Sequence, residues 1–202
     1  MRTYMWKKLE IALLLALAAT LLWGAASLHR QETLSHKMIR LHVIANSDSD
    51  ADQALKLQVR DAVLARATEL LTQSADMTDA WSRLEDALPA LEQTASAACG
   101  GAYPVRAELA ETEFPLKEYD GFALPAGRYP ALRVIIGAGA GRNWWCVVYP
   151  PLCTTACTDM ERVAIDAGLD GDDVKLIREE DGYVLRFRAV ELWQRLRQYL
   201  GK

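Results

Sequence analysis

The chain has 202 residues, of which 51% are hydrophobic and 25% are charged, a composition typical of one globular domain with a sizeable core. The formal net charge is −4 at pH 7. Lys and Arg do not cluster beyond the extreme N-terminus, so nucleic acid is not expected as a partner.

The first 26 residues have the three parts of an export signal. Arg2, Lys7 and Lys8 give a positive start, the apolar stretch IALLLALAATLLW follows, and the small residues of GAAS suit a signal peptidase. Glu10 leaves the segment short of the roughly 20 apolar residues of a spanning helix. We expect recognition by the export machinery, with residues 1–26 either cleaved or kept as a membrane anchor. Cleavage would change the formal net charge from −4 to −6.

A polar tether is expected at residues 27–37, followed by a folded domain over residues 38–202. Apolar and polar residues alternate from Met38 to Ala45, which predicts a strand. From Asp50 to Thr72 the apolar residues return at helical spacing, which predicts a helix. The polar stretch SDSDAD joins the two.

A second helical stretch is expected before the next strand. Thr78 is its predicted cap, and Pro89 either kinks this helix or opens a new segment that runs to the glycines after Cys99. Alternation from Tyr103 to Leu109 then predicts a strand. The stretch FPLKEYDGFALPAG, with two prolines and two glycines, is expected as a loop.

The last third of the chain is predicted to form strands and short helices. ALRVIIGAGAGRNWWCVVYPPLC predicts a strand, a glycine turn and another strand. A short helix over Asp159–Ala167, a hairpin about Asp181-Gly182 within VKLIREEDGYVLRFR, and a closing helix over Val190–Leu200 follow. Helices mix with hairpins instead of alternating with single strands. We therefore expect an α+β fold: a single compact domain with a mostly antiparallel sheet and packed helices, after an N-terminal export signal.

SDSDAD places carboxylates at every second position and raises the question of a metal or phosphate site. As an EF-hand loop it fails, because Gln53 stands where glycine is needed and Val59 where glutamate is needed. A phosphatase-like site with Asp48 as nucleophile and Asp50 as acid lacks identifiable partners. A helix start fits better, since Ser49 and Asp52 approximate a capping box. No metal and no cofactor are expected.

Three other features could have a chemical role: a histidine, a glycine-rich stretch and the cysteines. His42 is expected as a packed or rim residue more than as a catalytic base. GAGAGR resembles a dinucleotide loop, but a strand follows it instead of the helix that such a loop needs, so a hairpin turn is favoured. Among the four cysteines, Cys146 and Cys153 are the candidate disulfide, provided that the prolines between them turn the chain.

The strand NWWCVVY is apolar on both faces, because Trp144 and Trp145 point to opposite sides. Either helices cover both sides, or one side is an exposed aromatic patch of the kind that binds a partner. We expect one tryptophan to be exposed. The predicted partner-binding residues are Trp144, Trp145, Tyr149, His42, Asn46 and Asp48.

Several blocks of the sequence resemble the stage II sporulation protein R family of endospore-forming bacteria. They are LHVIANSDSDADQALKLQVRDAV, YPVRAEL, FPLKEYDGFALPAGRYPALRVIIGAGAGRNWWCVVYPPLC and RFRAVEL, in this order along the chain, within residues 36–193. Cys99 and Cys157 lie outside these blocks, which leaves their pairing open.

The resemblance implies a signalling protein that is made in the forespore and exported to the space between the two membranes around it. There it would trigger a membrane-embedded aspartic-type protease, its receptor, to process the precursor of a mother-cell sigma factor. On this interpretation the protein is not an enzyme. The alternative is an exported hydrolase acting on cell wall or on a phosphate-containing substrate, with His42, Asp48 and Asp50 as its working groups.

Overall fold

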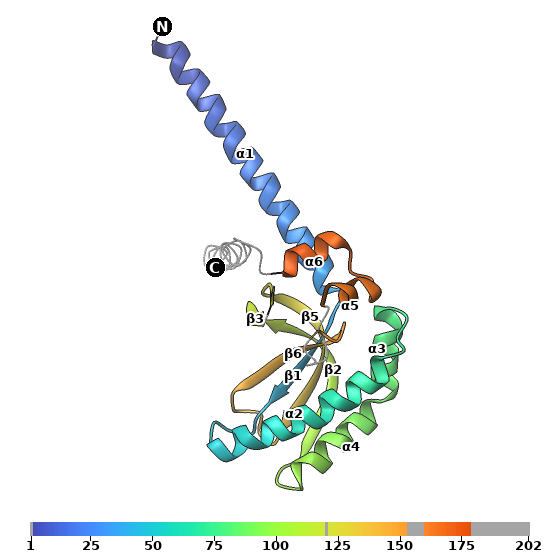
Figure 1. Cartoon of the computed structure of the whole chain (residues 1–202). Helices are drawn as coiled ribbons and strands as arrows, with labels where there is room; N and C mark the ends of the chain where they lie inside the picture. Colours follow the sequence, from blue (N-terminus) through green and yellow to red (C-terminus); the bar gives the residue numbers. More distant parts are fainter. Residues whose placement is uncertain (1, 120, 153–159, 179–202) are drawn as a thin grey trace.

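The computed structural model describes residues 2–119, 121–152 and 160–178 and has the predicted α+β fold. A long helix, α1 (Arg2–Ser35), projects away from a domain built on a four-stranded sheet (Figure 1). Three helices pack on one face of this sheet, and two short strands and two short helices gather near the base of α1 (Figure 1).

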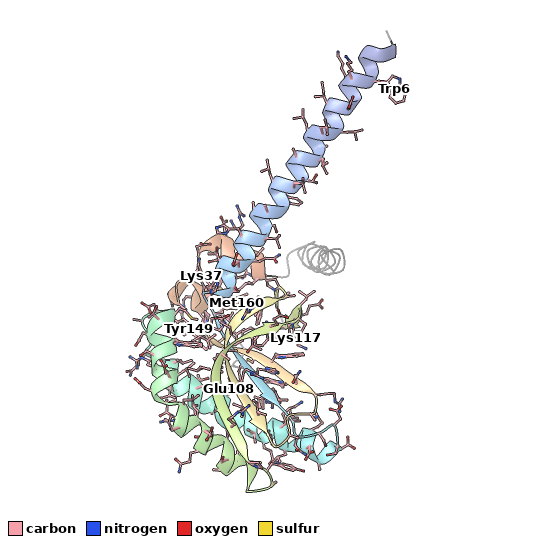
Figure 2. All side chains as sticks on the ribbon, turned by 180° about the vertical axis from the view of Figure 1, so that it is seen from behind. Trp6, Lys37, Glu108, Lys117, Tyr149 and Met160 are labelled. Atoms are coloured by element: carbon pink, nitrogen blue, oxygen red, sulfur yellow. The ribbon has the colours of Figure 1, made fainter. Side chains whose placement is uncertain are left out.

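Helix α1 is apolar over most of its length. The stretch Trp6–Ser35 is long and apolar enough to cross a membrane by length and composition, with a mean hydropathy of 2.2 over its best window. Its side chains project on all sides, with Trp6 near the free end (Figure 2). The residues expected as a polar tether mostly continue this helix, and Leu34 in its last turn is fully buried. The helix therefore enters the domain directly.

The main sheet has the strand order β2 (Val105–Phe114), β5 (Gly127–Ile136), β1 (Ile39–Ile44) and β6 (Asn143–Tyr149). Strand β1 runs parallel to β5 and antiparallel to β6, while β2 runs antiparallel to β5. The sheet is therefore mixed, with antiparallel pairing in two of its three ladders, as the prediction of a mostly antiparallel sheet requires.

The hairpin expected around GAGAGR is wrong. Strands β5 and β6 do not pair, because β1 lies between them. The glycine loop therefore crosses the end of β1 to connect its two neighbours. Local sequence gives no sign of this arrangement, since the inserted strand comes from a segment more than 80 residues earlier in the chain.

Helices α2 (Asp50–Leu71), α3 (Met77–Asp86) and α4 (Leu88–Cys99) cover the first face of the sheet. Apolar residues of β1, β5 and β6 form the main core with them, including Leu41, Leu132 and Val148. Pro89 opens the new helix α4 and does not kink α3. The cap of α3 is Asp76 and not the predicted Thr78, because the Asp76 carboxylate accepts a hydrogen bond of 2.9 Å from the Asp79 amide.

A second core lies on the other face, next to the base of α1. It combines Leu34 and Met38 with the short strands β3 (Lys117–Tyr119) and β4 (Phe122–Leu124) and the helices α5 (Met160–Asp166) and α6 (Gly171–Ile177). Lys37 connects the end of α1 to the start of α6, since its ammonium group donates hydrogen bonds to Asp173 at 2.5 Å and to Asp170 at 3.3 Å.

Two local predictions in this part of the chain are wrong. The segment expected as a loop contains the β3–β4 hairpin, whose three-residue strands are too short to show an alternating pattern. The residues VKLI belong to α6, which Asp170 caps, and not to a strand. The hairpin at Asp181-Gly182 and the helix over Val190–Leu200 lie outside the described residues.

Candidate functional site

The stretch after β1 is a helix start, as predicted. Ser49 is the cap of α2, and its hydroxyl accepts a hydrogen bond of 3.2 Å from the Asp52 amide. The capping box is only half formed, because the Asp52 carboxylate turns back towards β1. It accepts hydrogen bonds from Asn46 Nδ2 at 2.9 Å and from Ser47 Oγ at 2.6 Å.

These contacts favour the charged form of Asp52. The hydrogen bonds from Ser47 and Asn46 lower the pKa of this buried carboxyl below 3.8 and outweigh the opposing effect of burial. Its oxygens are thus engaged by neutral donors. Within the described ranges, no group of three or more His, Cys, Asp or Glu side chains is arranged to hold a metal ion.

The glycine loop, Gly137–Arg142, packs tightly on this helix start. The Asn46 side chain accepts a hydrogen bond of 3.0 Å from the Ala138 amide, and Asp48 accepts one of 2.7 Å from the Arg142 amide. A Cβ on Gly141 would lie 2.2 Å from the Ser47 carbonyl oxygen, so no other residue fits without a shift of backbone. Asn46 and Asp48, two of the predicted partner-binding residues, therefore hold a loop of their own chain.

A different set of functional groups lies on the second face of the sheet. Four residues, one from each strand, stand side by side in the ladder register: Glu108 opposite Arg133, Arg133 opposite His42, and His42 opposite Trp145. We call Glu108, Arg133, His42 and Trp145 the polar row. Arg133 Nη1 forms a short ion pair with the Glu108 carboxylate, and the His42 and Trp145 ring centres are 6.0 Å apart.

Arg40 lies next to the polar row, two residues before His42 on the same face of β1, and is fully buried. Its guanidinium carbon lies 4.0 Å from the centre of the Phe114 ring and 4.9 Å from that of Tyr129. Its Nη2 donates a hydrogen bond of 2.7 Å to the Tyr119 hydroxyl, while Nε and Nη1 have no hydrogen-bond partner in the part of the chain that the structure describes. The faces of these two rings thus stabilise the buried positive charge of Arg40. No carboxylate among the described residues forms an ion pair with it.

His42 is buried in this cationic surrounding. Loss of water lowers its pKa below 6.5, and the charges of Arg133 and Arg40 lower it further. The Asn143 side chain partly opposes this shift, but neither ring nitrogen of His42 makes a hydrogen bond of normal geometry with a described residue. The neutral imidazole is therefore the favoured form of His42 at neutral pH.

The six predicted partner-binding residues do not form one patch. His42 and Trp145 belong to the polar row, and Asn46 and Asp48 belong to the helix start. Tyr149 is 3% exposed in the main core and offers almost no surface. Trp144 packs against the same core with the Arg60 guanidinium 4.9 Å above its ring. The expectation of one exposed tryptophan is wrong, because both are partly buried, on opposite faces.

The cysteines are partly described. Cys146 is disulfide-bonded, and Cys99 is free and buried. Cys153, the predicted partner of Cys146, lies outside the described residues, as does Cys157. The pairing of Cys146 with Cys153 therefore stays a prediction.

Sequence reasoning missed Glu108, Arg133 and Lys117 as parts of the surroundings of His42 and Trp145. The strand order and register bring Glu108 and Arg133 into line with His42. Lys117 comes from the separate β3–β4 hairpin and lies near the Trp145 ring. The available signal was a polar residue within an otherwise apolar strand. Arg133 within ALRVII has this form, as Arg40 and His42 do within IRLHVI.

Comparisons with known proteins agree with the resemblance seen in the sequence. The profile of the stage II sporulation protein R family matches residues 35–159, a range that ends earlier than the blocks quoted above. The chain is 37% identical over 118 residues to stage II sporulation protein R of Bacillus subtilis (strain 168). That match covers 57% of this chain and 53% of the relative, so the chain spans about half the length of the relative. No solved structure matches the chain.

The fold and these matches define a sporulation protein with an α+β domain behind an apolar N-terminal helix. The chain belongs to the stage II sporulation protein R family. The name of the family denotes no enzymatic activity, and the apolar helix is compatible with a signal peptide or an anchor.

The glycine loop gives a first prediction. Replacing Gly141 by Ala forces a Cβ against the Ser47 carbonyl, and such overpacking lowers the free energy of unfolding by about 1 to 3 kcal/mol. Gly171→Ala is the control, because open space surrounds that position. Urea unfolding of the full chain in mild detergent measures both. Equal stability of Gly141→Ala and the wild type would contradict the tight packing of this loop.

His42 gives a prediction of pH dependence. The folded-state pKa lies below 6.5, so the unfolded chain binds more protons as the pH falls below 6.5. Stability should therefore decrease as pH falls from 6.5 towards the folded-state pKa, by at most about 1.4 kcal/mol per pH unit for one group. His42→Gln should remove this slope between pH 7.5 and 5, and the exposed His36→Gln should keep it. An unchanged slope in His42→Gln would show that His42 is not the group responsible.

Proposed function

We propose that this protein is an exported sporulation signal that triggers a membrane-embedded aspartic-type protease, which then processes the precursor of a mother-cell sigma factor. Export would take the protein from the forespore into the space between the two membranes. The observation that carries the proposal is the long apolar helix that leads directly into the domain of a sporulation family member.

The junction between helix and domain supports an action close to a membrane. Leu34 is buried in the second core, and the Lys37 ammonium group binds Asp173 on α6 and Asp170, the cap of that helix. In Figure 2, Lys37 lies where the helix meets the domain. If residues 1–26 stay attached, no flexible tether separates the domain from the apolar segment. The domain would then remain at the membrane surface, where a membrane-embedded protease is within reach.

A binding role fits the geometry better than catalysis by the candidate residues. His42 contacts the rings of Phe114 and Trp145, whereas Asp48 accepts hydrogen bonds in the glycine loop. Asp50 is an exposed residue of the first turn of α2. The described contacts therefore do not assemble these three residues into one reacting group.

Asp48→Asn separates the signalling function from the alternative, an exported hydrolase of cell wall or of a phosphate-containing substrate. The amide oxygen of asparagine can still accept the bond from the Arg142 amide, so we expect sigma-factor processing within about twofold of wild type. A catalytic Asp48 would instead lose activity by orders of magnitude. Immunoblots of the precursor in sporulating cells measure the outcome, and loss of processing by a stable variant would favour the hydrolase.

The proposed topology predicts the effect of removing the signal. A chain without residues 1–26 keeps Leu34 and Lys37 and should accumulate in the forespore as a folded protein that triggers no processing. Joining the same domain to an unrelated cleavable export signal should restore processing, because only location has changed. Processing by the signal-less chain, with fractionation proving its retention, would overturn the proposal. So would failure of the exported domain if it is folded and at wild-type level.

A further inference from the structure

We propose that the polar row, together with Arg106 and Lys117, binds a carboxylate-rich segment of the protein partner. We call these six residues the basic surface: Glu108, Arg133, His42, Trp145, Arg106 and Lys117. This inference rests on the proposed function for the identity of the partner. The chemistry of the surface is argued from its own contacts.

The basic surface is continuous and in part accessible. Arg106 stands two residues before Glu108 on β2, so both side chains point to the second face of the sheet. The Arg106 side chain is 67% exposed, and those of Glu108 and Arg133 are 31% and 28% exposed. Trp145 and Lys117 are partly exposed, and the Lys117 ammonium group lies 5.7 Å from the centre of the Trp145 ring. Figure 2 labels Glu108 and Lys117 on their strands.

Positive charge exceeds negative charge on this surface. Arg106, Arg133 and Lys117 carry three positive charges, with the buried charge of Arg40 next to them, against one carboxylate, Glu108. Glu108 is already shared, because it forms ion pairs with both Arg133 and Arg106. The whole chain has a net charge of −4. A concentration of cations on an acidic protein steers it towards anionic partners.

Several buried nitrogen atoms of this face are hydrogen-bond donors without an acceptor among the described residues. Nε of Arg133, Nε1 of Trp145, and both Nε and Nη1 of Arg40 are buried and have no hydrogen-bond partner within the described ranges. Buried donors of this kind are rare in folded proteins, because each loses its bonds to water without a replacement. A carboxylate supplies acceptors only, and guanidinium groups bind it with planar, charge-assisted hydrogen bonds. Carboxylates therefore match the cations at the surface, Arg106, Arg133 and Lys117, while the fully buried Arg40 adds its positive charge from within.

The middle of the surface fits a protein more closely than a diffuse anion. Trp145 stands between His42 and the Lys117 ammonium group. Tryptophan and arginine are the residue types that contribute most to protein–protein binding when they lie together in a partly desolvated patch. Anionic lipid and inorganic phosphate offer the same charge without a side chain to pack on the indole, so they serve as comparison ligands in the test.

Binding is tested first without the protease. The probe is a fluorescein-labelled deca-glutamate peptide, titrated by fluorescence anisotropy against the full chain in detergent micelles. Arg106→Glu and Lys117→Glu should each weaken binding about tenfold or more, because like charges then face each other. Arg66→Glu, on α2 in the opposite layer with a side chain 39% exposed, should change it less than twofold. Glu108→Gln should strengthen it, since it removes the one carboxylate of the surface.

Signalling is tested next, with the protease and the sigma-factor precursor in vesicles. The concentration of protein giving half-maximal processing should rise about tenfold or more for Arg106→Glu and Lys117→Glu, and stay unchanged for Arg66→Glu. Equal melting temperatures show that all variants are folded. If wild type binds the peptide but triggers no processing, the proposed function fails and the basic surface stands as an acidic-peptide site.

Any one of four results would overturn the inference. The first is that the wild type does not bind deca-glutamate. The second is that Arg106→Glu and Lys117→Glu behave like Arg66→Glu in both assays. The third is that protein-free phosphatidylglycerol vesicles bind the wild type more tightly than the peptide does, and that the same variants lose this binding. This third result would assign the surface to the membrane. If inorganic phosphate displaces the peptide at equal total charge, the surface is a general anion site and the inference also fails.

Discussion

The whole domain is arranged around β1, a strand that is buried on both faces. All six residues from Ile39 to Ile44 are at most 8% exposed, although Arg40 and His42 are polar. Its apolar side chains alternate towards the three helices and form the main core. Its polar side chains point the other way, so a charge and an imidazole enter a region poor in water. The helix layer, the glycine loop and the polar row all depend on this central position.

The burial of Arg40 determines what the second face of the sheet contains. A guanidinium group that has lost its hydration needs other stabilising contacts. Phe114 and Tyr129 supply aromatic faces, and Tyr119 supplies one hydroxyl from the short hairpin. Those contacts leave part of its hydrogen-bonding capacity unused. The hairpin, the polar row and the cations around it are therefore parts of one electrostatic arrangement. Burial, and after it the charges of Arg133 and Arg40, lowers the pKa of His42.

Sequence patterns predicted the elements that depend on neighbouring residues. The strand from Met38 to Ala45 and the helix from Asp50 to Thr72 agree with β1 and α2 within a residue or two, because alternation and helical periodicity are local properties. The hairpin around GAGAGR was wrong, because insertion of β1 between β5 and β6 is decided by packing across the whole chain. The polar row was missed for the same reason. Its members are distant in sequence, and only the register of four strands makes them neighbours.

Direct contact between the basic surface and the membrane-embedded protease is the central claim of this account. A photo-crosslinking residue placed at Arg106 in sporulating cells, with one at Arg66 as the control, measures that contact by mass spectrometry of the products. The account predicts an adduct from position 106 to an acidic segment of the protease outside the membrane, and none from position 66. Adducts from position 66 but not from position 106, or adducts from position 106 only to lipid, would contradict it.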